Sequence, residues 1–200
     1  MKKLSLLFSV ASIGLIFMIS SCTTVNLTSW KDPGTNVQVK HVFVMALFDK
    51  LEVSQPIEQY TANYFTAHGL VCTKSLDVIA PGTQLSEAEL NQKVTAAGAD
   101  AVLVFVPKTA DKSLDYNPPT YGGFYRGWYG GVYAVNPGYY SVSTTYHCQA
   151  NLYLVNGQKL VWTGDLSSTD PTSVQDAASH MAQSIYNDWV KNDLVTPPAK

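Results

Sequence analysis

Few residues of this 200-residue chain have the type and spacing that chemistry requires. His147 stands directly before Cys148, which suggests a nucleophile with its base or a pair of metal ligands. Neighbours on a strand point to opposite faces of the sheet, so these two side chains cannot act together. The other histidines, His41, His68 and His180, show no spacing typical of metal ligands. The sequence therefore predicts no metal site and no cofactor.

Charged residues that follow the predicted strands form a second candidate cluster. Carboxylates gathered at one edge of a sheet could act as a general acid and a general base. The residues concerned are Asp49, Lys50, Asp77, Lys108 and Asp111. The chain has neither a glycine-rich phosphate loop before its predicted crossover helices nor a Gly-x-Ser-x-Gly elbow. We predict no catalytic residues and no enzyme, with a periplasmic hydrolase as a remote alternative.

A segment rich in tyrosine and glycine, residues 109–140, is the most unusual part of the sequence. From Tyr116 to Tyr140 it contains seven Tyr, six Gly and one charged residue. Aromatic rings with polar tips suit recognition of a protein, a glycan or a bilayer surface. The segment has few amides and carboxylates, which favours a protein or a membrane over a glycan. We predict a binding loop whose candidate contact residues are Tyr121, Phe124, Tyr125, Arg126, Trp128, Tyr129 and Tyr133.

The N-terminus has the pattern of a secretory signal. Lys2 and Lys3 precede an apolar stretch that ends in small residues and then Cys22. A cysteine in this place resembles the lipobox of bacterial lipoproteins. The resemblance implies that residues 1–21 are removed as a signal peptide and that Cys22 is lipidated with acyl chains such as palmitate. Two or three such chains would hold the protein at its membrane.

The residue after the cysteine bears on which membrane that is. In the same class of lipoproteins an Asp at this position favours the inner membrane, and here the residue is Thr23. We predict an outer-membrane location facing the periplasm. Residues 22–36 are predicted to form the lipidated N-terminus and a short tether.

The composition excludes other classes of protein. Removing Lys2 and Lys3 with the signal leaves 11 basic residues against 15 acidic ones, which argues against a nucleic-acid partner. Three cysteines are too few for a disulfide scaffold. If Cys22 carries lipid, Cys72 and Cys148 remain, and we expect both to be buried, unbonded thiols.

Apolar patterns predict alternating strands and helices. Continuous apolar runs at 37–48 and 101–106 indicate strands buried on both faces, and 70–73 a short strand. Alternation on either side of Asn156-Gly157 predicts a β-hairpin over 146–166.

Helical periodicity fills the gaps between the strands. A helix capped by Ser54 or Gln55, with Pro56 in its first turn, is expected to end at Gly69. A capping box at Ser86 and Glu89 starts a second. Ser173 caps a third. The order β-α-β-α-β-loop-β-β-α predicts an α/β fold, close to α+β, with one mixed sheet of about five strands and helices packed on it. The single domain is expected over 37–195, with 196–200 as a tail.

Three motifs resemble a family of uncharacterised bacterial lipoproteins that carry a domain of unknown function. The motifs are Ser29-Trp30-Lys31-Asp32-Pro33, Ala97-Gly98-Ala99-Asp100-Ala101-Val102-Leu103-Val104 and Leu160-Val161-Trp162-Thr163-Gly164. The element order is also similar to the small α/β domain of the TolB N-terminus and of lipoproteins that activate penicillin-binding proteins. From the residues themselves we expect Trp30 to pack on the domain and Asp32-Pro33-Gly34 to form a turn.

Together these patterns predict a lipid-anchored module of the cell envelope that binds or assembles with a protein partner through the Tyr/Gly-rich loop. A module that binds peptidoglycan or another glycan is the alternative.

Overall fold

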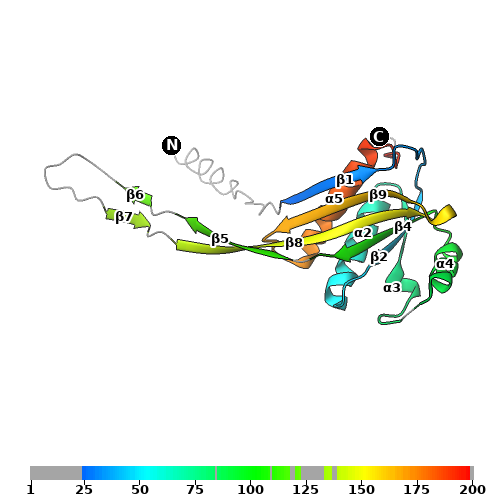
Figure 1. Cartoon of the computed structure of the whole chain (residues 1–200), viewed down its shortest axis with the longest axis horizontal. Helices are drawn as coiled ribbons and strands as arrows, with labels where there is room; N and C mark the ends of the chain where they lie inside the picture. The colour runs from blue at the N-terminus through cyan, green and yellow to red at the C-terminus, as the bar shows by residue number, and fades with distance from the viewer. Residues whose placement is uncertain are drawn as a thin grey trace, which may run out of the picture.

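The computed structural model describes residues 24–83, 85–108, 110–117, 120–122, 133–136 and 139–198, and within 113–143 it describes the backbone alone. Figure 1 shows an α/β body from which a long, narrow arm extends. The strands are β1 (Val25–Lys31), β2 (His41–Ala46), β3 (Val71–Lys74), β4 (Ala101–Pro107), β5 (Asp111–Asn117), β6 (Thr120–Gly122), β7 (Tyr133–Asn136), β8 (Tyr139–Leu154) and β9 (Leu160–Thr169). The helices are α2 (Leu51–Ala67), α3 (Ser75–Val78), α4 (Glu87–Ala96), α5 (Val174–Lys191) and the short η1 (Asn156–Gln158).

One open mixed sheet forms the centre of the body. Its strand order is β1-β9-β8-β4-β2-β3, and β5 pairs with β8 outside this path. β2 runs parallel to β3 and β4, whereas β4, β8, β9 and β1 pair antiparallel. The predicted mixed α/β architecture is confirmed in this coarse form. The sheet has seven strands instead of about five, because β1 and β5 were not predicted.

The first unpredicted strand changes the N-terminal boundary. β1 pairs with β9 along its whole length, from Val25 opposite Ser168 to Lys31 opposite Trp162. The expected domain start at residue 37 is therefore wrong, and residues 25–31 of the expected tether are part of the sheet. Only Val25 and Leu27 pack against the core. Two inward apolar residues among polar ones give only a weak hydrophobic pattern in the sequence. The strand is identified by its pairing with β9 and not by an apolar run.

The second unpredicted strand lies in the Tyr/Gly-rich segment. β5 pairs with the first part of β8, from Asp111 opposite Thr145 to Asn117 opposite Tyr139, and β6 pairs with β7 farther out. We call β5 together with residues 139–145 of β8 the arm. The prediction of a loop over 109–140 is thus wrong for the arm, which is a two-stranded ribbon (Figure 1). Its Thr and Tyr residues favour strands, but the surrounding Gly and Pro hid this preference.

The core lies between the sheet and two long helices. α2 and α5 pack against each other, and they contact β2, β3, β1 and β9. Trp162 of β9 and Trp189 of α5 meet edge to face, with ring centroids 5.7 Å apart, and both are fully buried. The Trp162 indole N–H donates to Asp188 Oδ2 over 2.8 Å, which fixes the helix against the sheet.

Predicted helix signals are largely correct. Ser86 and Glu89 form the capping box that starts α4, and Ser173 accepts a hydrogen bond from the Asp176 N–H at the start of α5. α2 begins earlier than expected, at Leu51, and includes Pro56 in its second turn. Gly98 takes a φ of +75° directly after α4, a conformation that glycine adopts without strain.

The first and last motifs lie side by side. Ser29 stands opposite Gly164, and Lys31 opposite Trp162. The Lys31 ammonium donates to the Asn192 carbonyl at the end of α5 over 2.6 Å. Trp30, which we expected to pack on the domain, is 50% exposed because it stands opposite Thr163 on the face away from α5. In the middle motif, Asp100 Oδ2 accepts from the backbone N–H of Lys40 and His41.

The predicted turn at Asp32-Pro33-Gly34 is present and is held by the Asp32 carboxylate. That carboxylate accepts from Thr35 Oγ1 over 2.5 Å and from the Gly34 N–H over 3.2 Å, and it pairs with Lys159. The hydrogen bond and charge of Lys159, followed by Thr35, lower the pKa of Asp32 from 3.8 to about 2. The turn therefore joins the end of β1 to the β8–β9 hairpin.

This lowered pKa makes a prediction for acid stability. A carboxylate with a depressed pKa stabilises the fold above its unfolded value of 3.8, and that contribution is lost as the pH falls toward about 2. We expect Asp32→Asn to lower the melting temperature at pH 7 and the gap from wild type to close between pH 4 and pH 2. Thermal unfolding of both proteins across this range measures it. A gap that stays constant over the acid range would contradict this role of Asp32.

Candidate functional site

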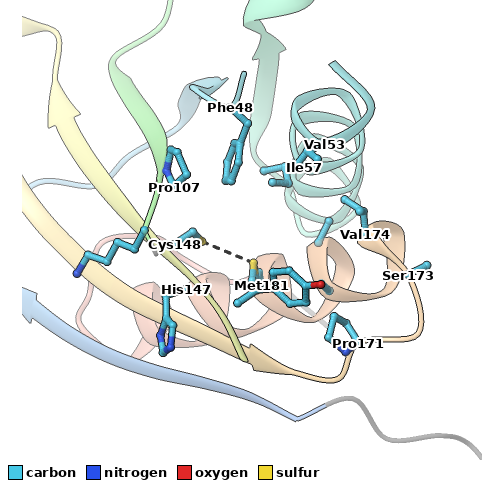
Figure 2. A pocket seen from close by; sticks show the side chains of 14 residues that line it. Phe48, Val53, Ile57, Pro107, His147, Cys148, Pro171, Ser173, Val174 and Met181 are labelled. Carbon is cyan, nitrogen blue, oxygen red and sulfur yellow. Dashed lines mark hydrogen bonds between the residues drawn. The ribbon is translucent and has the colours of Figure 1, made fainter. Parts of the chain in front are cut away.

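The carboxyl ends of β2 and β4 border an apolar cavity of about 460 Å³ (Figure 2). Phe48 follows β2 and Pro107 ends β4, and their side chains form one wall of the cavity. Ile57 of α2 and Val174 of α5 form the opposite wall. Open α/β sheets bind ligands at this edge, and the volume falls in the ~300–1,000 Å³ range of small-molecule pockets. The cavity also lies where the arm leaves the body, since Tyr146 of β8 lines it.

Two sulfur atoms meet in the wall of this cavity. Cys148 Sγ lies 3.8 Å from Met181 Sδ, as the dashed line in Figure 2 marks. Burial raises the pKa of the Cys148 thiol to about 12, so at neutral pH it is protonated and poorly nucleophilic. Sulfur atoms are soft and polarisable, so this part of the wall suits contact with an apolar ligand.

The two cysteines of the body are unbonded, as predicted. Cys72 lies on β3 at one edge of the sheet, and β2 and β4 separate β3 from the β8 strand that carries Cys148. Burial raises the pKa of the Cys72 thiol to about 11. Both residues therefore act as small apolar side chains.

A polar cluster lies beside the cavity. Lys108 Nζ is 2.5 Å from Asp165 Oδ1, and His147 Nε2 is 3.0 Å from Asp111 Oδ2. The His147 ring N–H is not directed at the Asp111 carboxylate, so this second contact is an ion pair only when the histidine is protonated. His147 and Cys148 occupy opposite faces of β8, which confirms that they cannot form a nucleophile and base.

The structure brings together only part of the charged set that the sequence placed at this edge. Lys108 and Asp111 lie in the cluster, whereas Lys50 pairs with Glu52 and Asp77 pairs with Lys74. His147 and Asp165 were not predicted to belong to this set. The pairing of β4 with β8 brings His147 to Lys108, and the pairing of β8 with β9 brings Asp165 there. In the part of the chain that the structure describes, no group of three or more His, Cys, Asp and Glu side chains is placed to hold a metal ion.

A second surface is the face of β1, β9 and β8 that lies opposite α2 and α5. Its residues form rows across the strands in register: Trp30, Thr163 and Asn151; Thr28, Asp165 and Gln149; Asn26, Ser167 and His147. Thr163 Oγ1 donates to Asn151 Oδ1 over 2.6 Å, and Gln149 Nε2 donates to Thr163 Oγ1 over 3.1 Å. We call this surface the polar face.

The candidate binding residues of the Tyr/Gly segment are only partly placed. Tyr121 lies in β6 and Tyr133 in β7, where Tyr121 stands opposite Ala134 and Tyr133 opposite Gly122. The other candidates and the predicted lipidation site lie outside the described residues; they are Phe124, Tyr125, Arg126, Trp128, Tyr129 and Cys22. The predicted contacts of the segment therefore stay predictions.

Comparison with known proteins gives distant likenesses. No family model and no curated protein matches the chain. Among solved structures, the PelC dodecamer from Paraburkholderia phytofirmans is 12% identical, with 86% of this chain and 99% of that chain covered at a TM-score of 0.45. Lipoprotein GNA1162 from Neisseria meningitidis is also 12% identical, with 76% and 99% covered at a TM-score of 0.42.

Both TM-scores are below 0.5, so no property of these two proteins is assigned to this chain. The resemblance to a family of uncharacterised lipoproteins remains a prediction from the motifs. Within the described residues, no helix combines the length and the hydropathy needed to span a bilayer.

Proposed function

We propose that this protein is a lipid-anchored, non-enzymatic module of the cell envelope that recognises a protein partner through the Tyr/Gly-rich end of its arm. The observation that carries the proposal is the arm itself. A ribbon that pairs seven residues of β5 with seven of β8 extends from the body, and β6 pairs with β7 beyond it (Figure 1). A paired ribbon loses less freedom on binding than an open loop of the same length, which favours specific recognition.

The first strand, β1, begins at the end of the body from which the arm extends. β1 begins at Val25, opposite Ser168, and Ser168 stands opposite Tyr146 of β8, just where the arm begins. If Cys22 carries the lipid, the arm starts close to the bilayer. The partner we propose is therefore a protein at or near the membrane surface, and the proposed membrane is the outer one, facing the periplasm.

Photo-crosslinking in living cells tests this proposal. A photoreactive residue replaces Trp128 or Tyr125 in the aromatic segment, and Tyr60 on α2, which is 38% exposed, serves as the control position. We expect a discrete crosslinked protein from Trp128 and Tyr125 and none from Tyr60. Equal crosslinking from all three positions, or none from Trp128 and Tyr125 in a stably produced protein, would overturn the proposal.

A second candidate function, glycan binding, is favoured by the polar face. Glycan sites place amides and carboxylates beside an exposed aromatic ring, and the aromatic segment offers few of these. The polar face supplies them, because half-exposed Trp30 lies in one row with Asn151, next to the row of Asp165 and Gln149. Peptidoglycan is the glycan to test for a protein in this compartment.

Co-sedimentation with purified sacculi separates the two candidates. If the polar face binds glycan, the Trp30→Ala protein should leave the pellet while a Tyr60→Ala control stays in it. If the wild-type protein stays in the supernatant, glycan binding is excluded and the proposal for the arm is unaffected.

A further inference from the structure

We propose that the cavity between α2, α5 and the ends of β2 and β4 binds one acyl chain, and that this chain is carried by Cys22 itself. The inference rests on the proposed lipidation and goes beyond it. It assigns the cavity an occupant and gives the lipid a second role, which is to fix the body against its own anchor.

The cavity has the chemistry of an acyl-chain site. Its walls are mainly apolar, and Phe48, Ile57, Val174 and Met181 surround the space (Figure 2). Charged groups beside it are already neutralised, since Lys108 pairs with Asp165. An occupant therefore needs an apolar body and no charge of its own, and each buried methylene group contributes to its affinity.

The register of the sheet brings the start of β1 close to this cavity. Val25, Ser168 and Tyr146 form one row across β1, β9 and β8, and Tyr146 lines the cavity. Neighbouring strands lie ~4.8 Å apart, which puts Val25 roughly 10 Å from Tyr146. Cys22 precedes Val25 by three residues, and three residues of extended chain span at most ~10 Å. An acyl chain on Cys22 can thus start within reach of the mouth.

Membrane anchoring survives the diversion of one chain. Stable anchoring needs about two acyl chains, and a lipobox cysteine of the triacylated kind carries three. With one chain in the cavity, two remain in the bilayer. The apolar end of the body is then held toward the membrane, together with the base of the arm.

The test uses the full lipoprotein in cells fed with a fatty acid that carries a terminal diazirine. Intact cells are irradiated before lysis, and peptides of the purified protein are analysed by mass spectrometry. We expect a crosslink that joins the Cys22 peptide to the peptide containing Cys148 or Met181. The mass of the N-terminal peptide reports lipidation in the same experiment.

The possible outcomes separate the two proposals. An unlipidated Cys22 would overturn the proposed anchor and this inference with it. A lipidated Cys22 without any adduct on the cavity peptides would overturn this inference alone. An adduct formed only by free membrane lipid would show that Cys22 is not the source, and would also overturn it.

Matched variants connect the crosslink to the cavity. Ala178 is 1% exposed and lines the cavity, so Ala178→Phe fills space that the acyl chain needs. We expect the crosslink to fall about tenfold, the loss of roughly two buried methylene groups. Met181→Leu leaves the volume of the cavity nearly unchanged and should retain the crosslink. Should Ala178→Phe unfold the protein, Val174→Trp at the edge of the cavity replaces it, and an undiminished crosslink in a folded filling variant contradicts the assignment.

Discussion

Replacing Glu58 with alanine is expected to cost about 3 kcal/mol of folding free energy or more. The Glu58 side chain is 1% exposed, and its carboxylate joins three parts of the body. Oε1 accepts from the Ala46 N–H over 3.0 Å and from Ser75 Oγ over 2.6 Å, and Oε2 accepts from the Leu76 N–H over 3.0 Å. Alanine leaves these three donors without an acceptor, at about 1 kcal/mol or more for each.

Equilibrium unfolding in urea measures this loss, with Glu52→Ala as the matched control on the same helix. Glu52 is 76% exposed and only pairs with Lys50, so its removal should change stability by no more than about 0.5 kcal/mol. If the two variants lose equal stability, the carboxylate of Glu58 does not hold α2 to β2 and α3.

The pH dependence of Glu58 has the opposite sign to that of Asp32. Burial raises the pKa of Glu58 above its usual 4.5, against the lowering effect of its hydrogen bonds. A group with a raised pKa makes a contribution to folding stability that is complete below pH 4.5. That contribution is lost as the pH rises through the pKa of the folded state. The stability gap between wild type and Glu58→Ala should therefore be widest below pH 4.5 and narrow as the pH rises.

Replacing Gly164 with alanine is the second change with a large expected effect, about 2–3 kcal/mol. A Cβ at this position would lie 2.5 Å from Trp162 Cη2 and 2.7 Å from Leu27 Cδ1. Trp162 cannot move aside, because it is fully buried, its indole N–H is bonded to Asp188 and its ring packs on Trp189. This glycine serves close packing between β1 and β9, and its φ is not in the left-handed region.

A double-mutant cycle checks the cause. Leu27→Ala removes one of the two obstacles, so the combined variant should lose less stability than the two single losses added together. Gly34→Ala is the control, since its Cβ would meet only Asp32 oxygens at 3.6 Å or more. Strict additivity of Gly164→Ala and Leu27→Ala would contradict the steric explanation.

The parts of the fold that could be predicted are those with a strong local signal. Val42 to Ala46 and Ala101 to Val106 are apolar on both faces and form central strands. Ser86 and Ser173 have the side-chain oxygen that a helix start requires. Such signals depend on a few neighbouring residues, so the sequence displays them directly.

The parts that could not be predicted depend on pairing between distant residues. β1 is stabilised by β9 over a separation of more than 130 residues, and its own sequence is mostly polar. The arm depends on the match of β5 to β8 across the Tyr/Gly segment. The cluster of Lys108, Asp165 and His147 depends on the pairing of β8 with both β4 and β9.

Shortening the Tyr/Gly-rich segment beyond the arm shows whether that segment recruits the partner. Asn117 stands opposite Tyr139, so a two-residue Asn-Gly turn in place of 118–138 would close the ribbon and remove the aromatic segment. A photoreactive residue at exposed Lys112, partway along the arm, reports on the partner in living cells. We expect a discrete crosslinked protein with the native arm and about a tenfold loss with the closed arm, equivalent to ~1.4 kcal/mol of binding, at unchanged melting temperature. A crosslink of undiminished strength from the closed arm would contradict the proposed recruitment.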